Sequence, residues 1–162
     1  MINSAFVNAL PEGLVFAPIY KQGAKMISGK AATGKNPLEE SYDRDFGASD
    51  VRLALNRNPD LQAIGLFCGP RGNGVVILDV DNNLKKHLKV WDKTLAGAPK
   101  IVSTKPNAAK YIFRVPEALW GEVEGHGLRE EENGAYEVLW GKRQGLIFGA
   151  YPGHKSGAPA GE

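Results

Sequence analysis

The chain has too little cysteine and histidine for a disulfide framework or a zinc cluster. Its 162 residues include a single cysteine, Cys68, and three scattered histidines. One thiol cannot form an internal disulfide, and this usage is typical of reducing compartments, so we expect an intracellular, cytoplasmic protein. The sequence also lacks an apolar run long enough to cross a membrane, and no signal peptide is predicted. Internal repeats are absent as well.

The chain also lacks a strong charge of one sign. The formal net charge is +2, which by itself does not indicate a protein that binds nucleic acid. Acidic residues concentrate in segments 39–45 and 122–132. Basic residues after position 84 include Lys85, Lys86, His87 and Lys89, then Lys100, Lys105, Lys110 and Arg114, and then Lys142 and Arg143. This distribution predicts either a basic face opposite an acidic one or an ordinary mixed surface.

What the chain does contain is enough apolar sequence for a core. Hydrophobic residues make up 43% of it, and 20 glycines and 10 prolines indicate many short elements joined by turns. We expect one compact domain over residues 1–157 and a flexible tail over 158–162. The expected class is α+β or α/β, with a mixed, largely antiparallel sheet.

The periodicity and the turn residues place the elements along the chain. Ser49 is a good N-cap for a helix that Asn58-Pro59 ends, and Pro18 predicts either an edge position for its strand or the end of that strand. Helices are expected over 4–10, over 50–55, and from a cap at Asn82 or Asn83 through Ala96. Strands are expected over 13–20, 63–68, 75–81, 101–104, 110–115, 135–140 and 145–148. The last two strands are predicted to form a hairpin through residues 141–144.

The most informative segment is 75–81, where apolar residues lead directly into two aspartates, Asp79 and Asp81. Such a run predicts a buried strand that starts from the glycine-rich turn before it. Because side chains alternate along a strand, both carboxylates emerge on one face. Neighbouring carboxylates repel each other, and Mg²⁺ or Mn²⁺ prefers carboxylate oxygens as ligands. The pattern predicts a metal site for phosphate chemistry; the alternative is an aspartate-rich strand end that only turns the chain.

A third acid, Glu137, lies within the otherwise apolar segment 136–140. A glutamate that faces inward needs a partner. If its strand neighbours the aspartate strand, Glu137 completes a site of three carboxylates with Asp79 and Asp81. The alternative is a glutamate at a sheet edge that pairs with a cation of the following turn.

Two cations, Lys110 and Arg114, alternate on one face of the expected strand 110–115. Cations that face an acidic metal site suit the binding of a triphosphate. The alternative is a strand with one face in solvent, the ordinary pattern of antiparallel sheets.

The segment 29–36 resembles a P-loop, but we expect it not to be one. Asn36 stands where the pattern requires a hydroxyl that binds Mg²⁺, and Pro37 follows at once. No convincing strand enters the segment, and no helix is predicted after it.

Several short motifs follow one another in an order and spacing typical of a known family. They are Lys35-Asn36-Pro37 and the segments 64–69, 76–81, 104–113, 136–138 and 151–157. Together, over about residues 13–157, they resemble the N-terminal domain of bifunctional DNA primase/polymerases (prim-pol), a branch of the archaeo-eukaryotic primase superfamily. The resemblance implies a small N-terminal α/β unit and a sheet like that of an RNA-recognition motif.

The resemblance also implies roles for individual residues. Asp79 and Asp81 match the metal-binding aspartate pair of the family, and Glu137 matches its third acid, which is usually aspartate. Lys110 stands where the family has a histidine that contacts the triphosphate of the nucleotide. A lysine still neutralises phosphate but does not shuttle protons near neutral pH as imidazole does.

Further residues are implied to orient the phosphates together with Lys110. These are Lys105, Lys35 and His154. Trp91, Trp120, Trp140 and Tyr151 are either base-stacking platforms or, as aromatics usually are, part of the core.

The resemblance implies a metal-dependent nucleotidyltransferase, with DNA primase or DNA polymerase activity or both. Mg²⁺ or Mn²⁺ is the implied cofactor. The implied partners are a DNA template and primer, nucleoside triphosphates and, in a full-length protein, a helicase domain; no membrane is implied. The first alternative is a non-catalytic replication module that binds nucleic acid or nucleotide. A phosphatase that uses the D-x-D strand end is a further alternative.

Overall fold

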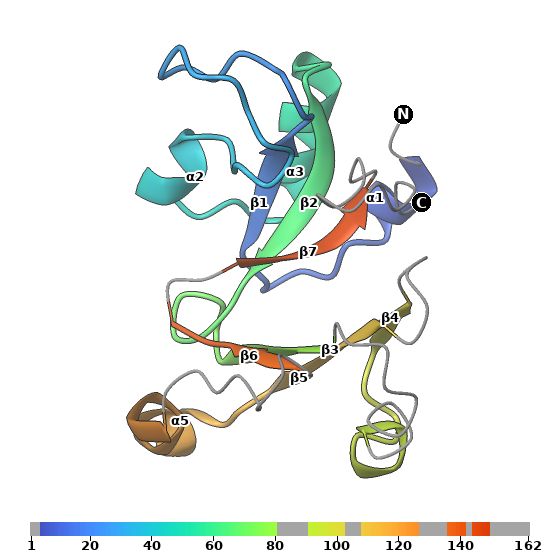
Figure 1. Cartoon of the computed structure of the whole chain (residues 1–162), viewed down its shortest axis with the longest axis vertical. Coiled ribbons are helices and arrows are strands. Elements are labelled where there is room, and N and C mark those ends of the chain that lie inside the picture. Colours follow the sequence, from blue (N-terminus) through green and yellow to red (C-terminus); the bar gives the residue numbers. More distant parts are fainter. Residues whose placement is uncertain (1–3, 81–90, 103–107, 127–135, 142–143, 150–162) are drawn as a thin grey trace. The chain divides into compact units, whose positions relative to one another are not determined.

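A computed structural model describes residues 4–80, 91–102, 108–126, 136–141 and 144–149 of the chain (Figure 1). The chain forms two compact units. Unit 1 comprises Met1–Phe67 and Gln144–Glu162, and unit 2 comprises Cys68–Arg143. Each unit has its own sheet, and all the described strand pairs are antiparallel. The expected α+β class with antiparallel sheets is thus confirmed.

Unit 1 is built on three strands in the order β1-β2-β7. The strands are β1 (Phe16–Tyr20), β2 (Leu61–Phe67) and β7 (Gln144–Gly149). Its helices are α1 (Ser4–Asn8), α2 (Glu40–Asp43) and α3 (Ala48–Arg57). Alternate residues of β1 and β2 build a core from Ala17, Ile19, Ala63 and Phe67. This burial holds the unit together, because apolar side chains removed from water stabilise the fold.

Strand β1 lies at the edge of its sheet, which is one of the two positions that Pro18 predicted. The free side of β1 is covered by the chain that follows it. The amide of Leu38 donates to the carbonyl of Pro18 at 2.7 Å, and the amide of Tyr20 donates to the carbonyl of Asn36 at 3.0 Å. These hydrogen bonds pair backbone groups on the free edge of β1 and fix the path of residues 36–38.

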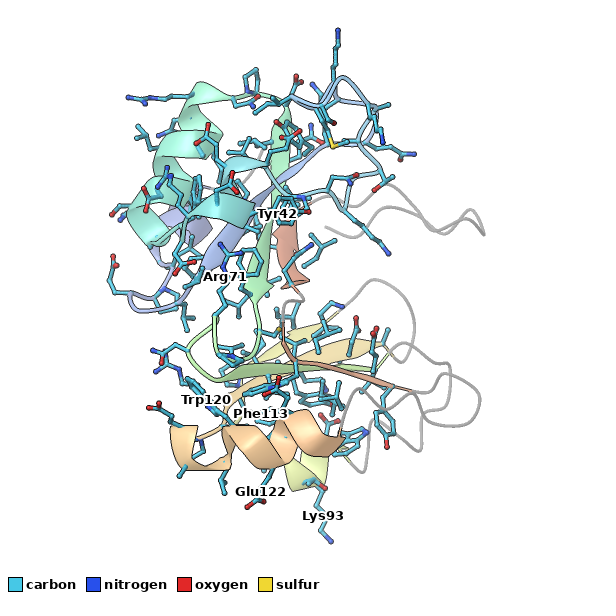
Figure 2. All side chains as sticks on the ribbon, turned by 90° about the vertical axis from the view of Figure 1, so that its left-hand side faces the viewer. Tyr42, Arg71, Lys93, Phe113, Trp120 and Glu122 are labelled. Atoms are coloured by element: carbon cyan, nitrogen blue, oxygen red, sulfur yellow. The ribbon has the colours of Figure 1, made fainter. Side chains whose placement is uncertain are left out.

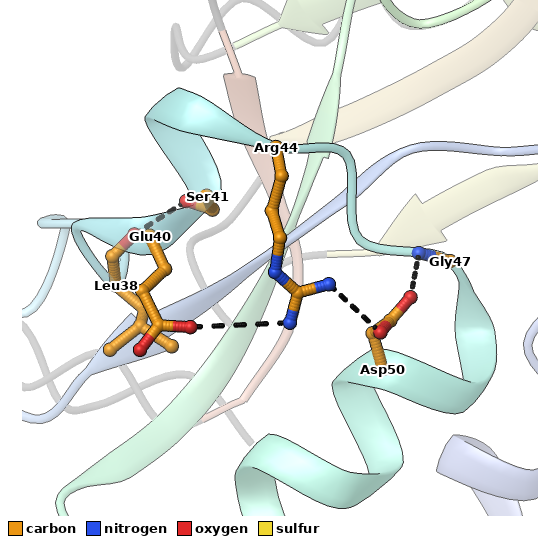
Figure 3. Close-up of polar contacts among 6 residues, drawn as sticks. All are labelled: Leu38, Glu40, Ser41, Arg44, Gly47 and Asp50. Carbon is orange, nitrogen blue, oxygen red and sulfur yellow. Dashed lines mark hydrogen bonds and ion pairs between the residues drawn. The ribbon is translucent and has the colours of Figure 1, made fainter.

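The start of helix α3 differs from the sequence prediction. Ser49 is not the N-cap; Gly47 is, and the carboxylate of Asp50 accepts the amide of Gly47 at 3.0 Å (Figure 3). Arg44 donates to the same carboxylate at 3.0 Å. These contacts, first the hydrogen bond from Arg44 and then that from Gly47, lower the pKa of Asp50. The charged acid in the first turn therefore does the capping that a serine hydroxyl was expected to do.

Unit 2 follows the order strand, helix, strand, strand, helix, strand. Its strands are β3 (Val75–Val80), β4 (Lys100–Val102), β5 (Ala109–Arg114) and β6 (Glu137–Leu139). Residues 91–94 are helical, and η1 (Glu117–Leu119) leads into α5 (Trp120–His126). The sheet order is β4-β5-β3-β6, so the first and third strands in sequence lie in the centre. This is the split β-α-β arrangement.

The two faces of the unit 2 sheet differ in chemistry. One face forms a core of Leu78, Val80, Ala109 and Tyr111, against which Trp91 and Leu95 pack. Figure 2 shows Phe113 and Trp120 near the sheet, whereas Lys93 and Glu122 point away from the body of the unit. Since side chains alternate, the other face carries the residues between these core positions. Asp79, Lys110 and Glu137 belong to that other face.

The turn that enters β3 is tight, as its glycines predicted. Gly69 and Gly74 have φ angles of +72° and +78°. The amide of Gly69 donates to the carbonyl of Val75 at 2.8 Å, and the amide of Gly74 donates to the carbonyl of Gly69 at 2.9 Å. Residues that adopt such φ angles without strain are almost always glycines, so this turn sets where β3 begins.

The predicted hairpin between the last two strands is wrong. β6 pairs with β3 in unit 2, and β7 pairs with β2 in unit 1. Gly141, between the two strands, has a φ of +75° and approaches the Gly69 turn, where a Cβ on Gly69 would meet the amide nitrogen of Gly141 at 2.5 Å. Each strand is thus buried by a partner distant in sequence, which outweighs the local tendency to form a hairpin.

Candidate metal and nucleotide site

Three charged residues form a row across the unit 2 sheet. Asp79, near the end of β3, lies directly opposite Lys110 of β5 on one side and Glu137 of β6 on the other. Residues directly opposite each other in an antiparallel pair share a face, with Cβ atoms about 5 Å apart. The fold therefore brings together an acid, a second acid and a cation that are distant in the sequence.

Asp79 and Lys110 are joined by an ion pair in which Nζ of Lys110 donates to Oδ2 of Asp79. The two side chains are 25% and 24% exposed, so the pair is accessible from solvent but largely surrounded by protein. Such a half-buried pair is screened less than a surface pair. Lys110 is thus the cation that neutralises Asp79 in this structure.

The residues of this row fit a divalent cation in their donor chemistry. The carboxylates of Asp79 and Glu137 are oxygen donors side by side on one face, and both residues are half-buried. Hard cations such as Mg²⁺ and Mn²⁺ prefer these ligands. Within the described ranges, no three histidine, cysteine, aspartate or glutamate residues assemble into one metal-binding group. Asp81, the third predicted ligand, lies outside those ranges.

Three further residues were predicted to bind phosphate: Lys105, His154 and Lys35. Lys105 and His154 lie outside the described residues. Lys35 is described and exposed, but it belongs to unit 1, where Nε2 of Gln144 donates to its carbonyl at 3.3 Å. Of the predicted set, the structure brings together Asp79, Glu137 and Lys110.

The segment 29–36 is not a P-loop, as expected. It is an irregular loop, and α2 begins only at Glu40. The amide and hydroxyl of Thr33 both donate to Oδ1 of Asn36 at 2.7 Å. The side chain that replaces the expected hydroxyl therefore closes the loop on itself.

A second charged cluster lies on the opposite face of the unit 2 sheet and was not predicted from the sequence. Oδ1 of Asp92 accepts Nζ of Lys100 at 2.6 Å and the hydroxyl of Tyr111 at 2.8 Å. These two hydrogen bonds, that from Lys100 first, lower the pKa of Asp92. Lys100 also lies 5.4 Å from the centre of the Tyr111 ring. The cluster joins the segment around residue 92 to β4 and β5, so its role is structural.

The tryptophans of unit 2 pack against neighbouring aromatic rings. Trp91 contacts Tyr136 edge-on with 5.4 Å between ring centres, and Trp120 contacts Trp140 in the same way at 6.3 Å. Nε1 of Trp120 donates to the carbonyl of Val115 at 2.9 Å. These contacts favour the core role for the rings over base stacking.

Unit 1 carries a basic surface formed by lysines of the loop that follows β1. Residues 13–38 contain four lysines and no acid. Lys21 pairs with Asp60 at 2.5 Å, whereas Lys25 and Lys30 are exposed and form no ion pair with any described residue. Ile27 and Tyr42 nearby are 70% and 59% exposed, and Figure 2 labels Tyr42 on α2.

An open pocket of about 320 Å³ has Lys30 in its lining. Its lining residues are Met26, Ser28, Lys30, Asn36, Pro37, Glu39 and Tyr42. Glu39 accepts the hydroxyl of Tyr20 at 2.9 Å and the amide of Ser28 at 3.3 Å, which ties the loop to β1. Burial, and then the bond to Glu39, raise the pKa of Tyr20 to about 12.

Comparisons with protein-family models, with curated proteins and with solved structures give no match for this chain. No helix in the described part of the chain is long and apolar enough to cross a membrane.

Proposed function

We propose that this chain is a metal-dependent nucleotidyltransferase of the DNA primase/polymerase type. The observation that carries the proposal is the register of β3 and β6, which sets Glu137 directly beside Asp79. A glutamate on the far side of the sheet would have left the two aspartates of the sequence without a third acid. Its position beside Asp79 is what a shared cation requires.

The topology of unit 2 supports the same proposal. A β-α-β-β-α-β order with the sheet order β4-β5-β3-β6 is the arrangement of RNA-recognition-type sheets. The prim-pol resemblance implies such a sheet beside a small α/β unit. On this proposal, unit 2 is the catalytic sheet and Asp79 lies near the end of one of its central strands.

Each residue of the row has a proposed task. Asp79 and Glu137, with Asp81 outside the described residues, hold Mg²⁺ or Mn²⁺. The bound ions supply activation of a 3′-hydroxyl and stabilisation of the departing pyrophosphate. Lys110 contacts the triphosphate and neutralises its charge, with Lys105, Lys35 and His154 as further proposed contacts.

The basic surface of unit 1 supports nucleic acid as the partner. Lys25 and Lys30 supply positive charge that phosphates of a template or primer neutralise. The exposed ring of Tyr42 is available for stacking with an unpaired base.

A second candidate function is favoured by the Lys110–Asp79 ion pair. A cation that is already paired with Asp79 suits a module that binds nucleotide or nucleic acid without chemistry. Primer extension in the presence of Mn²⁺ separates the two functions. Incorporation of nucleotides supports the enzyme, whereas oligonucleotide binding without incorporation supports the module.

A further inference from the structure

We propose that Lys110 is a resident counter-cation of Asp79, which a divalent ion must displace and which the triphosphate draws away. Metal and nucleotide then bind cooperatively, and the chain without nucleotide binds the metal poorly. This inference rests on the proposed function, because it concerns the same carboxylates, but its test measures metal binding and not catalysis.

The ion pair takes up an oxygen that the metal needs. Nζ of Lys110 donates to Oδ2 of Asp79, so one of the two oxygens is engaged before any ion arrives. An ammonium group also repels a divalent cation placed beside it, and the repulsion is strong where both are half-buried. Ion binding therefore requires the Lys110 side chain to move away from Asp79.

The sheet leaves few ways for a metal to bind Asp79 while Lys110 stays paired with it. Asp79 has Lys110 on one side and Glu137 on the other, and the register fixes all three backbones. Glu137 adds a second carboxylate but does not displace the lysine from Oδ2. Only the flexible side chain of Lys110 moves, and it moves when a stronger anion offers a new contact.

A triphosphate is such an anion. Its charge attracts the Lys110 ammonium, and the freed carboxylate of Asp79 would then be available to hold the metal that accompanies the triphosphate. Each ligand then raises the affinity for the other by the same factor, as linkage requires.

The test is a titration of the chain with Mn²⁺, monitored by the electron paramagnetic resonance signal of the free ion. The titration is carried out in the absence and in the presence of a non-hydrolysable nucleoside triphosphate. In the wild type, the nucleotide is expected to tighten Mn²⁺ binding by about 10-fold or more beyond the Mn²⁺ held by the nucleotide itself. In Lys110→Gln, Mn²⁺ alone is expected to bind about 5-fold or more tightly than in the wild type. The gain from the nucleotide is expected to shrink in the same variant.

Two further variants keep the test specific. Lys110→Arg retains the cation and is expected to keep the weak metal binding of the wild type. Lys100→Gln removes a lysine that also pairs with an aspartate but on the opposite face of the sheet, and it is expected to leave Mn²⁺ binding unchanged. Circular dichroism of each variant checks that the sheet is intact; if Lys110→Gln does not fold, Lys110→Met replaces it in the titration.

The inference is overturned if removal of the lysine charge leaves Mn²⁺ affinity unchanged or weakens it. This outcome differs from failure of the proposed function, which is the absence of primer extension. Tighter Mn²⁺ binding by Lys110→Gln in a chain that never extends a primer supports the counter-cation and rejects the enzyme. If the wild type extends a primer but Lys110→Gln leaves Mn²⁺ binding unchanged, the enzyme is supported and the counter-cation is rejected.

Discussion

Asp79 and Glu137 are register partners on β3 and β6, although β4, β5 and α5 lie between these two strands in the sequence. Their carboxylates share one face of the unit 2 sheet. Two acids held side by side by the backbone raise a demand for positive charge. Lys110 pairs with Asp79, and in the proposed enzyme a divalent ion binds both carboxylates.

We expect the entry to β3 to depend on Gly74. A Cβ at this position would lie 2.5 Å from the carbonyl oxygen of Val115 and 2.8 Å from Nε1 of Trp120. Its φ of +78° adds backbone strain for any other residue. Gly74→Ala is therefore expected to lower the free energy of unfolding by about 3 kcal/mol, measured by urea denaturation.

The matched control for this substitution is Gly97→Ala. Gly97 also has a positive φ, +89°, but a Cβ there meets nothing within 4 Å. The control is expected to cost only about 1 kcal/mol, the strain alone. Equal losses for the two variants would show that the close contacts at Gly74 have no energetic weight.

The Tyr20–Glu39 bond predicts a dependence of stability on alkaline pH. The folded state raises the pKa of Tyr20 from 10.0 to about 12, so it holds this proton more tightly than the unfolded chain. The corresponding stability is complete below pH 10 and is lost as the pH rises through about 12. Tyr20→Phe is expected to cost about 1 kcal/mol at neutral pH, and the difference from the wild type is expected to shrink as the pH approaches 12.

Urea denaturation of both proteins over this pH range measures the effect. Tyr42→Phe, at a ring that is 59% exposed, is the control and is expected to leave stability unchanged. A gap between wild type and Tyr20→Phe that stays constant up to pH 12 would refute the link to this hydroxyl.

The basic surface of unit 1 predicts a salt-dependent affinity for single-stranded DNA. Replacing both Lys25 and Lys30 by glutamine is expected to weaken the binding of an oligothymidine. The slope of log K against log salt is expected to fall by about 1.4, since each phosphate contact to a single strand contributes about 0.7. Lys93→Gln, a substitution of an exposed lysine of unit 2, is the control. An unchanged slope in the double variant would place the nucleic acid elsewhere.

The local elements could largely be predicted from the sequence. β3 was predicted over 75–81 and is observed over Val75–Val80. The prediction was possible because a short run of apolar β-branched residues between a glycine-rich turn and two acids rarely forms anything but a strand. The edge position of β1 followed from Pro18 for a similar local reason. The cap of α3 was misassigned because Ser49 and Asp50 stand two and three positions after Gly47, and only the backbone decides which of the two side chains accepts the Gly47 amide.

The pairing of strands could not be predicted from the local pattern. Segments 135–140 and 145–148 looked like a hairpin, but each is buried by a strand of a different sheet. The same limit applied to the site. The sequence indicated that Asp79 and Glu137 needed partners, but only the register shows that they lie beside each other and that Lys110 contacts Asp79. The cluster of Asp92, Lys100 and Tyr111 could not be predicted from the sequence, since an aspartate and a lysine eight positions apart are ordinary surface residues.

The most direct test is Mn²⁺-dependent primer extension by the wild type and by Asp79→Asn and Glu137→Gln. Both substitutions remove a carboxylate charge at nearly constant shape, and each is expected to lower extension by about 100-fold or more, with a parallel loss of Mn²⁺ affinity. Asp92→Asn, at the lysine-paired aspartate of the opposite face, is the matched control and is expected to retain extension while it remains folded. Extension that survives both substitutions, or a folded wild type that binds the primer and nucleotide but adds no nucleotide, would contradict the proposed enzyme.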